Sequence, residues 1–266
     1  MITTYLLYIT LGAFAGVLAG LLGIGGGLVI VPMLNITFEL QNFPVQHIQH
    51  IALGTSLATI IFTSISSMRA HHKRGAINYT AFWQLVPCII TGSYLGAWIA
   101  SIMSTMFLKS LFGVFLYYVA TQMLLSIKPK SSRELPGNAG IFGVGNVIGV
   151  FSALVGIGGG TLTVPFLSCC NQTMHTAIAT AAAVGLPIAL AGTAGFVYNG
   201  LGVEGIPGPH VGYVYIPAFL GIIAMSVVTA PLGAKLAHSL PVNKLKRIFA
   251  FLLYLVGTKM LWSAFA

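Results

Sequence analysis

The chain has 266 residues, of which 57% are hydrophobic and only 6% carry a charge. A soluble domain carries roughly 25% charged residues, so this composition excludes one and identifies a polytopic membrane protein. The formal net charge of +9 lies mostly in a few loops, where it reports orientation in the membrane, so it does not indicate a nucleic-acid partner.

The predicted elements in chain order are eight apolar segments, four in each half of the chain. They cover residues 4–34, 48–68, 79–102, 107–127, 139–169, 174–198, 213–237 and 245–265. We expect a first membrane repeat over residues 1–127, a charged linker over 128–137 and a second membrane repeat over 138–266. The N-terminus has no basic region, so it is predicted to belong to the fold and not to a cleaved signal.

Matching phrases in the two halves show that the chain arose by duplication. GLLGIGGGLVIVPML contains Gly23 to Gly27, and ALVGIGGGTLTVPFL contains Gly156 to Gly160, 133 residues later. LKSLFGVFLYYVATQMLLS at 108–126 matches LKRIFAFLLYLVGTKMLWS at 245–263. The two copies therefore extend over nearly the whole chain.

Each glycine phrase is predicted to break a helix. Its apolar segment is longer than the ~20 residues that a helix needs to cross a bilayer. Clustered glycines weaken a helix by about 1 kcal/mol each relative to alanine and let the backbone turn. A new half-helix is expected to start at Leu28 and at Thr161, followed by Pro32 and Pro165, which are tolerated near a helix start.

The basic residues predict how the halves are oriented. They form three clusters, at Arg69–Arg74, at Lys128–Arg133 and at Lys235–Arg247. If every segment crossed once, these clusters would lie on both sides of the membrane, against the positive-inside rule. If each broken segment returns to its own side or crosses twice, all three clusters are cytoplasmic. The two repeats are then inverted, a common transporter design with its site where the breaks meet.

The half-helix starts are candidate anion sites. Free backbone N–H groups and the positive end of the helix dipole favour an anion at such a start. The candidate substrate-binding residues in the two phrases are Gly25, Gly26, Gly27, Leu28, Gly158, Gly159, Gly160 and Thr161. Close helix packing through small residues is the alternative explanation of these glycines. A nucleotide fingerprint is disfavoured because the last glycine of GxGxxG and the surrounding βαβ unit are missing.

The acidic residues also disfavour a cationic substrate. The chain has no aspartate, and its glutamates, Glu39, Glu134 and Glu204, are expected between the apolar segments. Carriers of metal ions or organic cations usually need carboxylates within the membrane. Backbone carbonyls remain possible cation ligands. We expect no metal and no cofactor. Cys88, Cys169 and Cys170 show neither metal-ligand spacing nor a disulfide framework, and for the adjacent pair packing and a redox or sulfur-chemistry role both remain open.

Two matched pairs of polar residues complete the candidate site. His50 corresponds to His175, and Thr55 to Thr180, each 125 residues apart. A histidine near neutrality carries a proton or hydrogen-bonds an oxyanion, although either one alone is more often structural. Thr55, with Thr59 and Thr63 on the same helical face, lines a polar path or bonds back to its own helix.

The paired GLLGIGGG–VP and ALVGIGGG–VP phrases in an eight-segment chain resemble the TauE/SafE family of sulfite-exporter-like membrane proteins. The resemblance extends over essentially the whole chain. It implies a bacterial inner-membrane transporter of a sulfur-containing anion such as sulfite, thiosulfate or an organosulfonate. Differences between the copies, such as Leu28 against Thr161 and Ser56 against Ala181, make the site asymmetric.

The sequence therefore predicts an all-α integral membrane protein that moves a small inorganic or organic anion across the lipid bilayer by alternating access. Two other classes stay open. An intramembrane enzyme would need a nucleophile–base or metal constellation, and no HExxH, GxSxG or histidine–carboxylate set occurs. A structural membrane protein would show no flux in liposomes.

Overall fold

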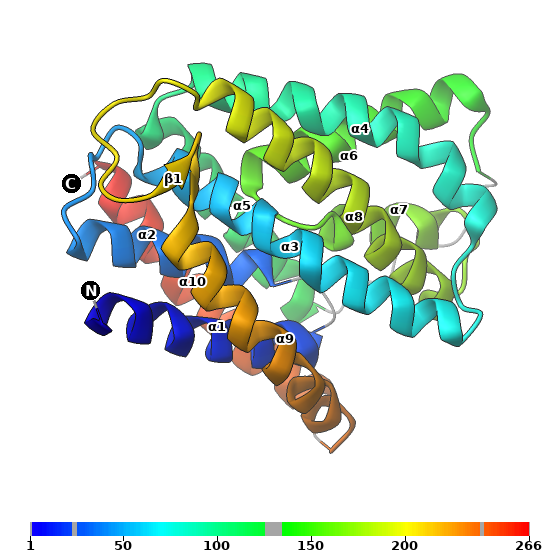
Figure 1. The fold of residues 1–266 in the computed structure, drawn as a ribbon. Coiled ribbons are helices and arrows are strands. Elements are labelled where there is room, and N and C mark those ends of the chain that lie inside the picture. Colours follow the sequence, from blue (N-terminus) through cyan, green and yellow to red (C-terminus); the bar gives the residue numbers. More distant parts are fainter. Residues whose placement is uncertain (1, 23–25, 126–134, 240–241, 266) are drawn as a thin grey trace.

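The computed structural model describes residues 2–22, 26–125, 135–239 and 242–265 (Figure 1). Within these ranges the chain forms ten α-helices and one β-hairpin. The helices are α1 (Ile2–Leu22), α2 (Gly27–Leu40), α3 (Ile48–Lys73), α4 (Tyr79–Ile102), α5 (Thr105–Leu125), α6 (Asn138–Val155), α7 (Gly160–Cys169), α8 (Met174–Asn199), α9 (Ile216–Ser239) and α10 (Val242–Phe265). The hairpin pairs β1 (His210–Val211) with β2 (Val214–Tyr215).

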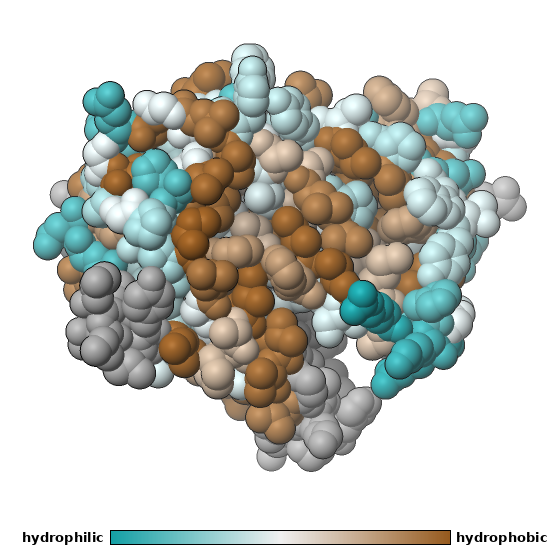
Figure 2. Space-filling view, viewed as in Figure 1, coloured by the Kyte–Doolittle hydropathy of each residue, from teal (hydrophilic) through white to brown (hydrophobic). Residues whose placement is uncertain are grey.

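The helices confirm the prediction of an all-α integral membrane protein. Six of them, α3, α4, α5, α6, α8 and α10, contain stretches long and apolar enough to cross a bilayer. Apolar side chains cover the middle of the face shown in Figure 2, and hydrophilic ones gather toward its two ends. This is the surface that a bilayer requires of a protein that spans it.

Both glycine phrases interrupt their segments, as predicted. The first separates α1 from α2 and the second separates α6 from α7. Gly26 and Gly159 precede the half-helices with φ of 76° and 73°, in the left-handed region that favours glycine. The half-helices begin at Gly27 and Gly160, one residue before the predicted starts. In Figure 1 the N-terminus and the end of α2 lie at the same end of the molecule, so the chain turns back on itself at the first break.

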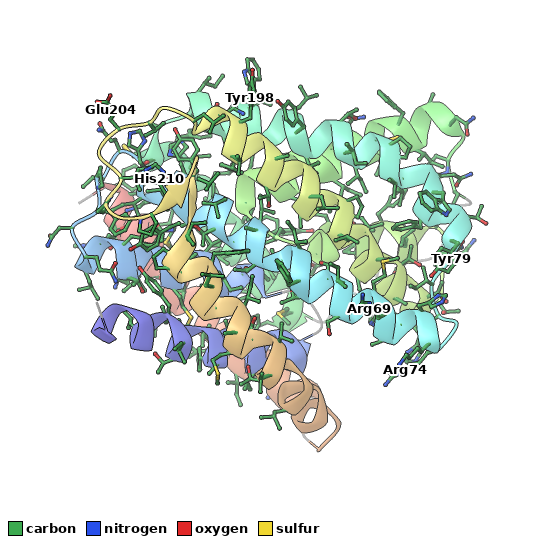
Figure 3. All side chains as sticks on the ribbon, viewed as in Figure 1. Arg69, Arg74, Tyr79, Tyr198, Glu204 and His210 are labelled. Atoms are coloured by element: carbon green, nitrogen blue, oxygen red, sulfur yellow. The ribbon has the colours of Figure 1, made fainter. Side chains whose placement is uncertain are left out.

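The loops divide between two ends of the molecule. Arg69 and Arg74 lie at the end where α3 turns into α4, whereas Glu204 and His210 lie at the opposite end (Figure 3). The C-terminal end of α9 is also directed away from both chain termini (Figure 1). The predicted basic cluster at Lys128–Arg133 lies outside the described residues.

Helix packing is reciprocal between the two halves. α1 packs on α9 as α6 packs on α4, and α4 packs on α8 as α9 packs on α3. α2 contacts α3 as α7 contacts α8. The pairs α3–α8 and α5–α10 each join two corresponding helices. Exchanging helices α1–α5 with α6–α10 therefore leaves this set of packed pairs unchanged.

Hydrogen bonds follow the same exchange. The Tyr117 and Thr258 hydroxyl oxygens are 2.7 Å apart, and so are those of Thr121 and Tyr254, the corresponding pair. Each bond joins α5 to α10. These four residues occupy matching positions in the repeated segments 108–126 and 245–263, so the duplicated sequence has kept a duplicated contact.

One predicted boundary is wrong. The segment predicted over 213–237 begins as the β-hairpin, and α9 starts only at Ile216. Gly208 and Gly212, with φ of 80° and 55°, give this loop its turns. The hairpin lies against α3, because a side-chain carbon built on Gly54 would be 2.7 Å from the Tyr213 carbonyl oxygen.

Candidate functional site

The two helix breaks meet inside the molecule. A side-chain carbon built on Gly27 would lie 2.5 Å from the carbonyl oxygen of Gly156, so only glycine permits this approach. Ser56 of α3 donates a hydrogen bond of 3.0 Å to the same carbonyl. Gly156 of the second break thus contacts both α3 and the first residue of α2, the half-helix that follows the first break.

The backbone of the second break leaves a group of donors free. α6 ends at Gly156 in the left-handed conformation, and the Ile157 N–H donates to the Ser152 carbonyl at 3.0 Å. α7 then begins with the N–H groups of Leu162 and Thr163 donating to the Gly159 carbonyl. Within the described residues, the N–H groups of 158–161 donate to no backbone carbonyl. Four donors are therefore available at the positive end of α7.

Unpartnered hydroxyl groups surround these donors. Ser152, Thr161 and Thr163 are buried, and their side-chain oxygens have no hydrogen-bond partner among the described residues. A side-chain carbon built on Gly159 would lie 3.4 Å from Thr163 Oγ1 and 3.7 Å from Ser152 Oγ. A buried hydroxyl without a partner costs about 1–3 kcal/mol, so each of these groups has free capacity to hydrogen-bond a ligand or a water molecule.

None of the described residues named above at the second break has an ionisable side chain. The donors there are backbone N–H groups and hydroxyls, which bind an anion through dipoles without a fixed positive charge. Ser152 and Thr163 were not among the residues predicted from the sequence. The signal was present, since Thr163 lies inside the second glycine phrase where the first phrase has Ile30.

The first break differs in its side chains. The N–H groups of Val29 and Ile30 donate to the Gly26 carbonyl, both at 3.0 Å, and Gly26, Gly27 and Leu28 are buried. The first turn of α2 presents the apolar side chains of Leu28, Val29 and Ile30. Gly25, also predicted to bind substrate, lies outside the described residues.

The matched histidines have unlike surroundings. His50 is buried in the first turn of α3, where its Nε2 donates to the carbonyls of Ala100 at 3.0 Å and Met103 at 3.1 Å. Its ring stacks on Tyr213 with centroids 5.1 Å apart. His175 is exposed in the first turn of α8. The structure therefore gives His50 contacts that hold α3, α4 and the hairpin, and does not bring the two histidines together.

The matched threonines join the two halves. The Tyr215 N–H donates to Thr55 Oγ1 at 3.0 Å, and the Asn78 N–H donates to Thr180 Oγ1 at 3.0 Å. Asn78 precedes α4 and Tyr215 precedes α9, so the two bonds are related by the exchange of the halves. These hydroxyls are occupied by protein, unlike those at the second break. Thr59 and Thr63 bond back to carbonyls of their own helix.

One ion pair departs from the expectation for the glutamates. Glu39 lies in the last turn of α2 and not between segments, and its Oε1 is 2.6 Å from Nζ of Lys109 on α5. Ser263 of α10 lies 3.3 Å from both groups. Lys109 is buried and is repeated as Lys246 in the sequence, but the pairing requires α2 and α5 to be neighbours, which no local pattern reveals.

Comparisons with known proteins agree with these features. The family described as sulfite exporter TauE/SafE matches residues 8–260. A probable membrane transporter protein of Haemophilus influenzae is 38% identical over 98% of this chain and 99% of its own length. Another, from Methanocaldococcus jannaschii, is 30% identical over 96% of this chain and 94% of its own.

No solved structure matches the chain. The family and the names of these relatives indicate transport and not enzymatic catalysis. With its duplicated helices, its two glycine breaks and a match over nearly its whole length, the chain belongs to the sulfite exporter TauE/SafE family of membrane transporters.

Proposed function

We propose that this transporter carries a small anion across the bacterial inner membrane by alternating access. The observation that supports this most strongly is the second break, where the free N–H groups of 158–161 adjoin three buried, unpartnered hydroxyls. Such a set of neutral donors suits an anion and offers a cation little.

A sulfur-containing oxyanion is the substrate that we favour. Sulfite, thiosulfate and organosulfonates each present several acceptor oxygens around one sulfur, which match donors that converge from α6 and α7. The description of the family as sulfite exporters supports this choice. A site without a fixed cation binds such an anion weakly enough to release it, as transport requires.

Inverted repeats supply the route for alternating access. The reciprocal packing of the halves, and the opposite directions of the corresponding helices α3 and α8 in Figure 1, support a two-fold relation with its axis in the membrane plane. In this arrangement the breaks lie between the repeats and the basic loops face the cytoplasm. Rocking of one repeat against the other would expose the second break to each side in turn.

Flux of radiolabelled sulfite and thiosulfate into proteoliposomes, with and without a pH gradient, tests the proposal. We expect uptake above that of protein-free liposomes, competition by unlabelled oxyanion and no uptake of labelled methylammonium. Label recovered chemically unchanged distinguishes a carrier from an intramembrane enzyme. Uptake equal to that of protein-free liposomes for every anion would contradict the proposal and favour a structural role.

A further inference from the structure

We infer, on the basis of the proposed function, that the two breaks have different tasks. The second break alone binds the oxyanion, with Ser152 and Thr163 as its specificity-determining residues. The first break is a packing contact that holds the second in place. The chain accordingly binds one anion and not two, although its glycine phrase is duplicated.

Three of the sequence differences between the copies change hydrogen-bonding capacity. At the spacing of 133 residues that aligns the glycine phrases, Ser152, Thr161 and Thr163 correspond to Ala19, Leu28 and Ile30. Each hydroxyl of the second copy is thus replaced by a hydrocarbon in the first. The glycines and the following proline are the same in both copies, and both breaks form, but only the second copy has hydroxyl side chains at these three positions.

The contacts give the first break a different environment. Gly27 lies against the Gly156 carbonyl and against Ile60, and Leu28 and Ile30 belong to the hydrophobic core. Residues 26–30, the described part of the first break, therefore carry no hydroxyl group. The start of α7 has instead two hydroxyls beside Gly159 that are fully buried and have no partner within the described part of the chain.

A hydrogen bond to the backbone of the second break also lacks a counterpart in the other half. Ser56 of α3 donates to the Gly156 carbonyl, whereas the corresponding residue of α8 is Ala181. The carbonyl that ends α6 thereby accepts a hydrogen bond from α3. What remains near Gly159 is a set of donors that match an anion with several oxygens. A spherical halide would leave part of this set unsatisfied.

Calorimetric titration of the purified protein in detergent with thiosulfate, and with chloride for comparison, tests the inference. The key variants are Ser152→Ala and Thr163→Val, which remove the hydroxyls and keep the side-chain volume. Each should weaken thiosulfate binding by about 10- to 100-fold, the usual contribution of a hydrogen bond to a charged group. Thr163→Ser, which keeps the hydroxyl, should bind within a few-fold of the native protein.

Stability separates this role from a structural one. Because the two hydroxyls have no partner among the residues that the structure describes, their removal should leave the melting temperature unchanged or raise it. Ser168→Ala is the matched control, since Ser168 is a buried, unpartnered serine at the far end of α7. It should leave thiosulfate binding unchanged and, like the other two variants, leave the melting temperature unchanged or raise it.

Each failure has its own signature. If the native protein binds no oxyanion, the proposed function itself is contradicted. If it binds thiosulfate but Ser152→Ala and Thr163→Val bind equally well, the anion lies elsewhere and the inference is overturned while the proposed function stands. Two thiosulfate ions per chain, or a melting temperature that falls with the loss of either hydroxyl, would also overturn it.

Discussion

Adjacent glycines of the second break have different requirements. Gly159 has φ of 73°, and a side-chain carbon there would lie 2.3 Å from Ile188 Cδ1. Gly158 does not have a positive φ, and a carbon there would meet only Ile60 Cγ2, at 3.2 Å. Gly158 leaves space for the Ile60 side chain, which can move. Gly159 instead provides the left-handed backbone conformation that directs the chain into α7.

We therefore expect Gly159→Ala to destabilise the protein more than Gly158→Ala. A left-handed conformation costs an alanine about 1–2 kcal/mol, and the contact with Ile188 adds to it. Thermal unfolding in detergent measures both variants. Equal melting temperatures for the two would show that the backbone of the break is not as described. Because Gly26 and Gly159 both have positive φ, replacing either by valine would impair folding together with transport, so the hydroxyl variants test binding more cleanly.

Thr55 and Thr180 give a second prediction at this scale. Each accepts a backbone N–H from the other half, so Thr55→Val and Thr180→Val should each lower stability by about 1–3 kcal/mol, because a buried N–H loses its acceptor. Thr59→Val is the matched control, since Thr59 bonds only to its own helix, and its effect on thermal unfolding should be smaller. A larger effect at Thr59 would contradict the inter-repeat role.

Among the elements, α2 is joined to the α5–α10 pair by charge. Lys109 is buried, Glu39 is its counter-ion and Ser263 contacts both, so three helices meet at one ion pair. α2 is also the half-helix whose first residue, Gly27, lies against the Gly156 carbonyl. The ion pair therefore fixes one end of α2 while the first break fixes the other.

Removing one partner of the Lys109–Glu39 ion pair should lower stability, and removing the second partner as well should restore most of it. Lys109→Met leaves Glu39 without a counter-ion and should destabilise the protein by about 3 kcal/mol, near the lower end for buried pairs because Glu39 is 31% exposed. Lys109→Met/Glu39→Gln should recover most of the loss. A double-mutant cycle on thermal unfolding measures the coupling, and additive effects would exclude a direct interaction.

Most helices and both helix breaks were predictable from the sequence, whereas the contacts between distant residues were not. Segment lengths and clustered glycines predicted the helices and both breaks to within one residue at the half-helix starts, because these features depend on local backbone chemistry. The hairpin before α9 was missed, since its apolar residues read as the start of a helix. The Lys109–Glu39 pair and the bonds of Thr55 and Thr180 join residues distant in sequence, so only the packed structure could reveal them.

At the scale of the whole molecule, the charges at its two ends predict which end faces the cytoplasm. Arg74 and Glu204 lie at opposite ends (Figure 3), and the basic end is proposed to be cytoplasmic. In a background without Cys88, Cys169 and Cys170, a cysteine at position 204 should react with an impermeant thiol reagent added to whole cells. A cysteine at position 74 should react only after the cells are opened. The reverse pattern would contradict the proposed orientation.

The most direct test of the central claim is a structure of the protein with selenite, an anomalously scattering analogue of sulfite, at a concentration that saturates transport. We expect one selenium position per chain at the start of α7, with oxygens in hydrogen-bond reach of the N–H groups near Gly160 and of Ser152 Oγ and Thr163 Oγ1. Selenium bound at the start of α2 or beside Lys109, with the start of α7 empty, would contradict the account.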